Sequence, residues 1–168
     1  MDSAAAPSLV DAALRGALVA LLLLLTGLLW RDRPRSANRR VEIALLLGLV
    51  VQVAASTPRF EASVALVWRA PLIAVSVGNA VLFWLFVSSL VDDEFALRPW
   101  HVAVWLVVMG YVAFVMGVAA PGGWRATGWL FAVQRALPPA FALLAAITAG
   151  RNWRADLVEP RRRLRAFV

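Results

Sequence analysis

The sequence predicts an all-α fold, a polytopic membrane bundle of about five transmembrane helices. Of its 168 residues, 62% are hydrophobic, and the mean hydropathy is +0.76. A soluble domain is usually about 45–50% apolar. The apolar residues also fall in runs, and short Arg clusters lie between or after them. Because a water-soluble fold could not bury this excess, we expect the chain to lie in a lipid bilayer.

Five apolar segments are the expected spans, and together they would form one bundle over residues 1–150. They cover about residues 12–30, 41–55, 70–91, 99–120 and 125–149. In the first segment, the positive cluster follows the apolar run. A signal peptide has the opposite charge order, so we expect this segment to remain uncleaved as a span. The second is short for the roughly 20 residues that a span needs, and it requires some bilayer thinning.

Proline and glycine mark the expected helix boundaries. Pro71 suits the first turn of the third span, and Pro99 opens the fourth. Residues 121–123 read Pro-Gly-Gly, which predicts a turn before the fifth span. Gly150 is the expected C-cap of that span, and residues 151–168 follow as a basic cytoplasmic tail. Residues 60–68 are expected to form a turn or interfacial helix.

The arginines predict the orientation, with the N-terminus outside and the C-terminus in the cytoplasm. The segments 31–40, 92–98 and 151–168 would face inward, and they hold five, one and six Arg respectively. The outward loops would hold only Arg59, Arg69 and Arg125. This asymmetry follows the positive-inside rule and indicates a multi-pass membrane protein.

The residue inventory argues against catalysis. There is no Cys and only one His, His101, so thiolate chemistry and a His-rich metal cage are excluded within one chain. Residues 92–94 read Asp-Asp-Glu and could bind a cation, but consecutive helical positions point in different directions, which favours a solvated loop. His101 could sense pH, although an interfacial histidine without a special role is favoured. We therefore expect no enzyme, no metal and no cofactor.

Four polar residues inside the spans are the candidate ligand-binding residues. Arg135, Asn79, Tyr111 and, nearer the outer surface, Gln52 would lie in the outer half of the bilayer. Because an ionisable group in a span is costly, one interpretation is an outward-open pocket with Arg135 as its cationic anchor. The alternative is that Arg135 extends toward the headgroups while the amides join helices by hydrogen bonds, and this alternative is favoured.

Two stretches are more specific than hydropathy. One reads APLIAVSVGNAVLFWLF over residues 70–86, followed by DDEF at 92–95 and RPWH at 98–101; the other reads ADLVEPRRRLR over 155–165. Together they resemble the N-terminal multi-span membrane part of bacterial AraC-type transcription regulators. In that family, the Arg-rich stretch is a cytoplasmic loop followed by two more spans and a DNA-binding domain with two helix-turn-helix units.

The chain departs from that plan at its end, since no helix-turn-helix segment follows residue 165. We therefore expect no specific nucleic-acid binding by this chain alone, and either a shortened regulator or a membrane sensor that works by itself. The expected function is a non-catalytic sensory or regulatory membrane domain. Its expected partners are the lipid bilayer and either a second copy or a regulatory protein of the membrane or cytoplasm. The alternatives are a small transporter or channel subunit, and a remnant without activity.

Overall fold

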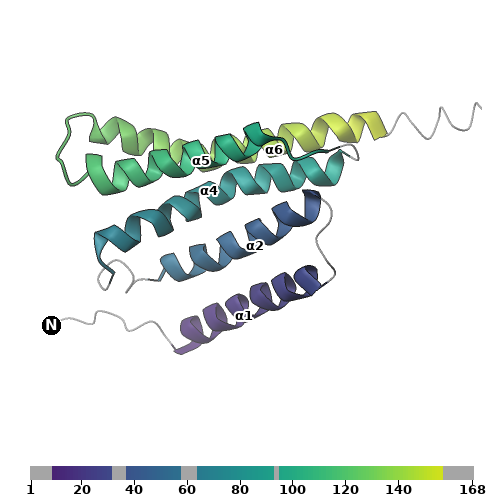
Figure 1. The fold of residues 1–168 in the computed structure, drawn as a ribbon, viewed down its shortest axis with the longest axis horizontal. Helices are drawn as coiled ribbons and strands as arrows, with labels where there is room; N and C mark the ends of the chain where they lie inside the picture. The colour runs from purple at the N-terminus through teal and green to yellow at the C-terminus, as the bar shows by residue number, and fades with distance from the viewer. Residues whose placement is uncertain (1–8, 32–36, 58–63, 93–94, 157–168) are drawn as a thin grey trace, which may run out of the picture.

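The structure is a computed structural model that describes residues 9–31, 37–57, 64–92 and 95–156. Apart from short turns and connections, these residues are helical (Figure 1). The helices are α1 (Leu9–Arg31), α2 (Ala37–Ala55), α4 (Leu66–Val91), α5 (Pro99–Phe114), the π-helical segment η1 (Val115–Ala119) and α6 (Thr127–Asp156). The predicted all-α fold class is confirmed. The Arg-rich end of the second sequence stretch, residues 157–165, lies outside the described residues.

Four of these helices are long and apolar enough to cross a membrane. They are Leu9–Arg31, Trp68–Val91, Pro99–Ala119 and Thr127–Arg151. α2 is a helix at the predicted place, but Arg39, Arg40 and Glu42 in its first two turns give it more charge than a typical span. The length and composition of the helices thus support a membrane protein.

α4 is the central helix of the bundle. It packs against α2 on one side and against α5 and α6 on the other, whereas α1 packs mainly against α2. Figure 1 shows the helices side by side with similar axes, with α1 at the edge. A change in the position of α4 would therefore reach three neighbouring helices directly.

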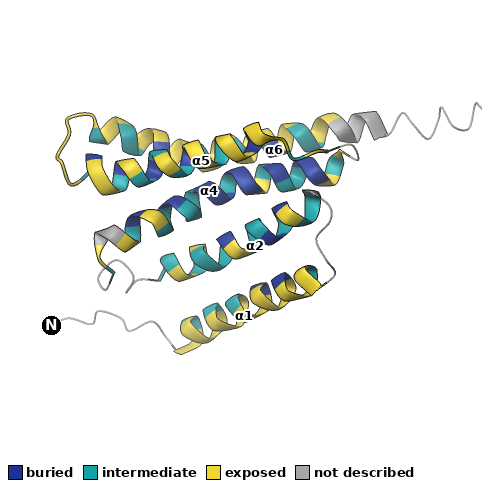
Figure 2. Cartoon of the chain, viewed as in Figure 1, coloured by how far each residue is buried: buried dark blue, intermediate teal, exposed yellow. Residues whose placement is uncertain are grey.

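The buried side chains gather on α4, as Figure 2 shows. Val81 and Leu85 are 0% and 2% exposed and form the core cluster with Val41 of α2 and Val108 of α5. Trp84 and Trp105 pack partly buried against this cluster.

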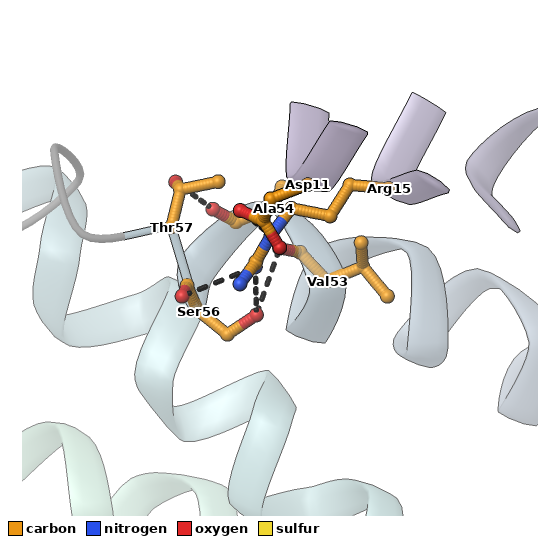
Figure 3. A network of polar contacts seen from close by, with 6 residues as sticks. All are labelled: Asp11, Arg15, Val53, Ala54, Ser56 and Thr57. Carbon is orange, nitrogen blue, oxygen red and sulfur yellow. Dashed lines mark hydrogen bonds and ion pairs between the residues drawn. The ribbon is translucent and has the colours of Figure 1, made fainter. Parts of the chain in front are cut away.

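α1 is largely exposed and is held to α2 by a polar contact at one end (Figure 3). Most of its leucines are exposed, which is the pattern of a surface that contacts lipid. The Arg15 Nε atom lies 2.9 Å from Asp11 Oδ2, and Arg15 Nη1 donates to the carbonyl and hydroxyl oxygens of Ser56 at 3.2 and 3.0 Å. This contact fixes the start of α1 against the end of α2.

Two predicted helix boundaries are wrong. α4 begins at Leu66, so Pro71 lies in its second turn and removes one intrahelical hydrogen bond there. α6 continues through Gly150 to Asp156, so the expected C-cap falls inside a helix. A glycine costs only about 1 kcal/mol in a helix interior, which the neighbouring turns can offset.

The turn between η1 and α6 agrees with the sequence. η1 ends at Ala119. The backbone N–H of Ala120 donates to the Val115 carbonyl at 2.9 Å, and this bond between residues five apart is the pattern of a π-helix. Gly123 has a φ of +62°, a conformation that L side chains rarely adopt. The expected turn or interfacial helix over residues 60–68 is described only in part; Leu66–Trp68 belong to α4, and residues 60–63 lie outside the described part.

Candidate functional site

Two of the four candidate residues meet between α2 and α4. The Asn79 Nδ2 group donates a hydrogen bond of 2.9 Å to Gln52 Oε1. Asn79 is only 5% exposed, and its Oδ1 atom has no hydrogen-bond partner in the described part of the chain. That oxygen lies against Gly48 of α2, which has no side chain to displace it. The pair therefore forms a direct polar link between the two helices.

Tyr111 makes a separate contact between α5 and α6. Its hydroxyl donates a hydrogen bond of 2.9 Å to the Leu130 carbonyl. The acceptor lies in the first turn of α6, close to the connection from η1. Tyr111 thus joins two helices, as Asn79 does, but through different partners.

Arg135 is not brought to the other three. It lies on the exposed surface of α6 and makes no hydrogen bond or ion pair with another described residue. Its neighbour Gln134 faces inward instead, being 8% exposed, with an Oε1 atom that lacks a partner among the described residues. Because successive helical residues turn by about 100°, burial of Gln134 places Arg135 outward. The contact of Arg135 with Asn79, Tyr111 or a backbone carbonyl that the pocket interpretation requires is therefore not found within the described chain.

A second polar site, which the sequence did not indicate, lies at the C-terminal end of α4. It is a cleft of about 420 Å³ between the end of α4, the segment 95–98, the start of α5 and the last turns of α6. Its apolar lining includes Trp84, Phe95 and Trp100. Its polar lining consists of Ser88, Asp92, Arg98, His101, Thr148 and Arg151.

His101 is held in a fixed orientation within this cleft. The backbone N–H of Arg98 donates to His101 Nδ1 at 3.0 Å, an arrangement that also caps α5. The ring is 6% exposed and stacks on Phe95, with centroids 5.4 Å apart. Since Nδ1 accepts a hydrogen bond, a neutral ring carries its proton on Nε2. That Nε2–H group has no partner among the described residues, so it is available to a ligand.

The charged groups of the cleft come from separate segments. Arg98 precedes α5, Arg151 lies near the end of α6, and Asp92 directly follows α4; all three are exposed. The positive end of the α5 dipole also lies at the cleft. Within the described residues, no group of three or more His, Cys, Asp and Glu could hold a metal ion. The lining thus offers cationic donors and aromatic faces, the chemistry of a binding site for a small polar molecule.

Comparison with known proteins adds no relative. No protein-family model, curated protein or solved structure matches the chain. Functional proposals therefore rest on the bundle, the Asn79–Gln52 link and the cleft at the end of α4.

Proposed function

We propose that the chain is a non-catalytic sensory or regulatory domain of a multi-pass membrane protein. The observation that carries this proposal is the position of the cleft at one end of α4, the helix that packs against α2, α5 and α6. A ligand can shift a conformational equilibrium when it binds one arrangement of helices better than another. Occupation of this cleft would act on the helix best placed to pass such a change through the bundle.

The topology that we propose has five spans, an external N-terminus and a cytoplasmic C-terminus in a bacterial inner membrane. The distribution of Arg supports this orientation through the positive-inside rule. The cleft would then face the cytoplasm, on the side where the resemblance to AraC-type regulators places their output domain. The partners would be the bilayer and either a second copy of this chain or a regulatory protein of the membrane or cytoplasm.

A small transporter or channel subunit is the second candidate function. A transport path needs polar groups through the whole thickness of the membrane. Among the described residues, the buried polar side chains are Thr26, Asn79, Ser88, Ser89, His101 and Gln134. Several of these, such as Thr26 and Ser88, donate to carbonyls of their own helix and so do not extend a path. The regulatory role is therefore favoured.

Transcript profiling tests the regulatory proposal. A host strain that lacks the gene should show altered transcript levels, of about threefold or more for its targets, and the wild-type chain should restore them. A chain in which Arg161, Arg162, Arg163 and Arg165 are replaced by glutamine should insert normally but fail to restore them, because the basic tail would no longer contact its partner. Arg125→Gln, on the opposite side of the bundle, is the control and should restore them fully.

The proposal would be contradicted by unchanged transcripts in the deletion strain. If that strain instead showed a changed uptake of a solute, and proteoliposomes with the purified chain carried the same solute, the transport alternative would replace it.

A further inference from the structure

We propose that the cleft between α4, α5 and α6 binds the phosphate group of a hydroxyl-bearing ester, held by Arg98, Arg151 and His101. This inference goes beyond a regulatory role and does not depend on any output from the domain. It concerns only what the cleft binds.

The donors of the cleft fit an oxyanion. Arg98 and Arg151 present guanidinium groups, which bind phosphate oxygens through paired N–H donors. His101 adds its Nε2–H donor, because the hydrogen bond from the Arg98 backbone N–H uses only Nδ1. Arg98 and His101 lie at the start of α5 and Arg151 lies near the end of α6, so these donors can contact a phosphate group from more than one direction. No donor among them is committed to another described residue.

The acceptors of the cleft fit a hydroxyl group on the same ligand. The Ser88 hydroxyl donates to the Trp84 carbonyl at 2.9 Å, and the Thr148 hydroxyl donates to the Leu144 carbonyl at 2.8 Å. Because each hydroxyl proton is already used, these two oxygens offer only lone pairs to a ligand. A bare phosphate ion would leave these acceptors unused, whereas an ester with free hydroxyl groups could donate to them.

The aromatic wall fits the carbon part of such an ester. Trp84 and Trp100 lie with their ring centroids 5.9 Å apart, and Phe95 stacks on His101 beside them. A volume of about 420 Å³ accommodates a glycerophosphate-sized group and falls within the range of about 300–1,000 Å³ found for ligand sites. The cleft also lies at the ends of three helices, which is the headgroup level if these helices cross a bilayer. The ester could therefore come from a phospholipid headgroup or from a soluble metabolite.

Binding by the purified full chain distinguishes these sources. Native mass spectrometry would compare retention of phosphatidylglycerol with that of phosphatidylcholine. Thermal unfolding in detergent would be followed in glycerol 3-phosphate and in inorganic phosphate, since a ligand that binds only the folded state raises the midpoint. The test variant is Arg98→Gln with Arg151→Gln. The matched control is Arg31→Gln with Arg125→Gln, which removes the same charge from exposed positions outside the cleft.

Preferential retention of phosphatidylglycerol that is weakened at least about tenfold in the cleft variant and less than about twofold in the control would support the lipid source. The larger loss is expected because the cleft variant lacks both guanidinium groups, and charge-assisted hydrogen bonds to phosphate are stronger than neutral ones. Stabilisation by glycerol 3-phosphate with the same variant pattern would support the soluble source. Binding that falls equally in both variants would overturn the proposal, since it would reflect net charge alone. Absence of any preference for the phosphate esters in the wild-type chain would also overturn it.

A second variant keeps the test valid if the double glutamine variant does not fold. Thr148→Trp fills the cleft from α6 without removing a charge, and Thr148 is half-buried at its edge. We expect binding to weaken on the order of tenfold. The midpoint of thermal unfolding without ligand should stay close to that of the wild type. Unchanged binding by a folded Thr148→Trp chain would place the ligand elsewhere and overturn the assignment.

Discussion

Replacing Gly48 with alanine is expected to destabilise the bundle by about 1–3 kcal/mol, the cost of inserting a methyl group where there is no room. The nearest atoms to that methyl group all belong to the Asn79 side-chain amide, and its carbon would lie 2.9 Å from Asn79 Cγ and closer still to Oδ1. The amide cannot move aside freely, because it is buried and donates to Gln52. Either that hydrogen bond breaks or α2 and α4 move apart.

Gly110→Ala is the matched control for this experiment. Gly110 lies inside α5, and a methyl group there would meet nothing within 4 Å. Alanine is the better helix former by about 1 kcal/mol, so this variant should be neutral or slightly more stable. Thermal unfolding of both variants in the same detergent gives the comparison. Equal midpoints would show that Asn79 does not approach α2 at Gly48.

Replacing Leu85 with alanine is expected to lower the free energy of unfolding by about 2–5 kcal/mol, the range for emptying a buried leucine site. Leu85 is 2% exposed on the face of α4 that meets the other helices, and it belongs to the same cluster as Val81 and Val108. The loss arises from packing, because its side chain contacts protein and not lipid. Protease resistance and thermal unfolding of the purified variant would measure it.

Leu90→Ala is the control on the same helix. Leu90 is 61% exposed, so its truncation removes few contacts within the protein and should change the midpoint little. A Leu90 variant as unstable as the Leu85 variant would contradict the assignment of the buried face of α4. It would also point to a partner chain that covers Leu90.

The sequence predicted the helices better than their faces. Apolar runs between Arg clusters were sufficient to locate α1, α2, α4, α5 and α6, because a span must be long and hydrophobic whatever it contacts. The same property hid the orientation of each helix, since a helix that is apolar on every side carries little periodic signal. Asn79 and Gln52 were expected together from their depth, and they do meet. The pocket interpretation placed Arg135 with them by depth alone, but Arg135 lies on the exposed surface of α6.

The cleft was missed for a different reason. Its polar groups come from four separate segments. Residues 92–95 and 98–101 belong to the stretch that resembles AraC-type regulators, but that resemblance assigns no ligand-binding residue, and none of the four segments carries a motif for a known binding chemistry. Arg98 and Arg151 were interpreted only as inward-facing loop charges, and His101 as an interfacial histidine. The one local signal was the spacing of His101 three residues after Arg98, which allows the His101 side chain to accept the Arg98 backbone N–H and cap α5.

The membrane topology is the central claim, and reporter fusions test it most directly. Fusions of an enzyme active only in the cytoplasm would be placed after residues 36, 95, 122 and 155, with a periplasm-active reporter at the same positions. The account predicts a cytoplasmic location for residues 36, 95 and 155 and a periplasmic location for residue 122. A periplasmic signal after residue 155 would contradict the five-span arrangement with an external N-terminus.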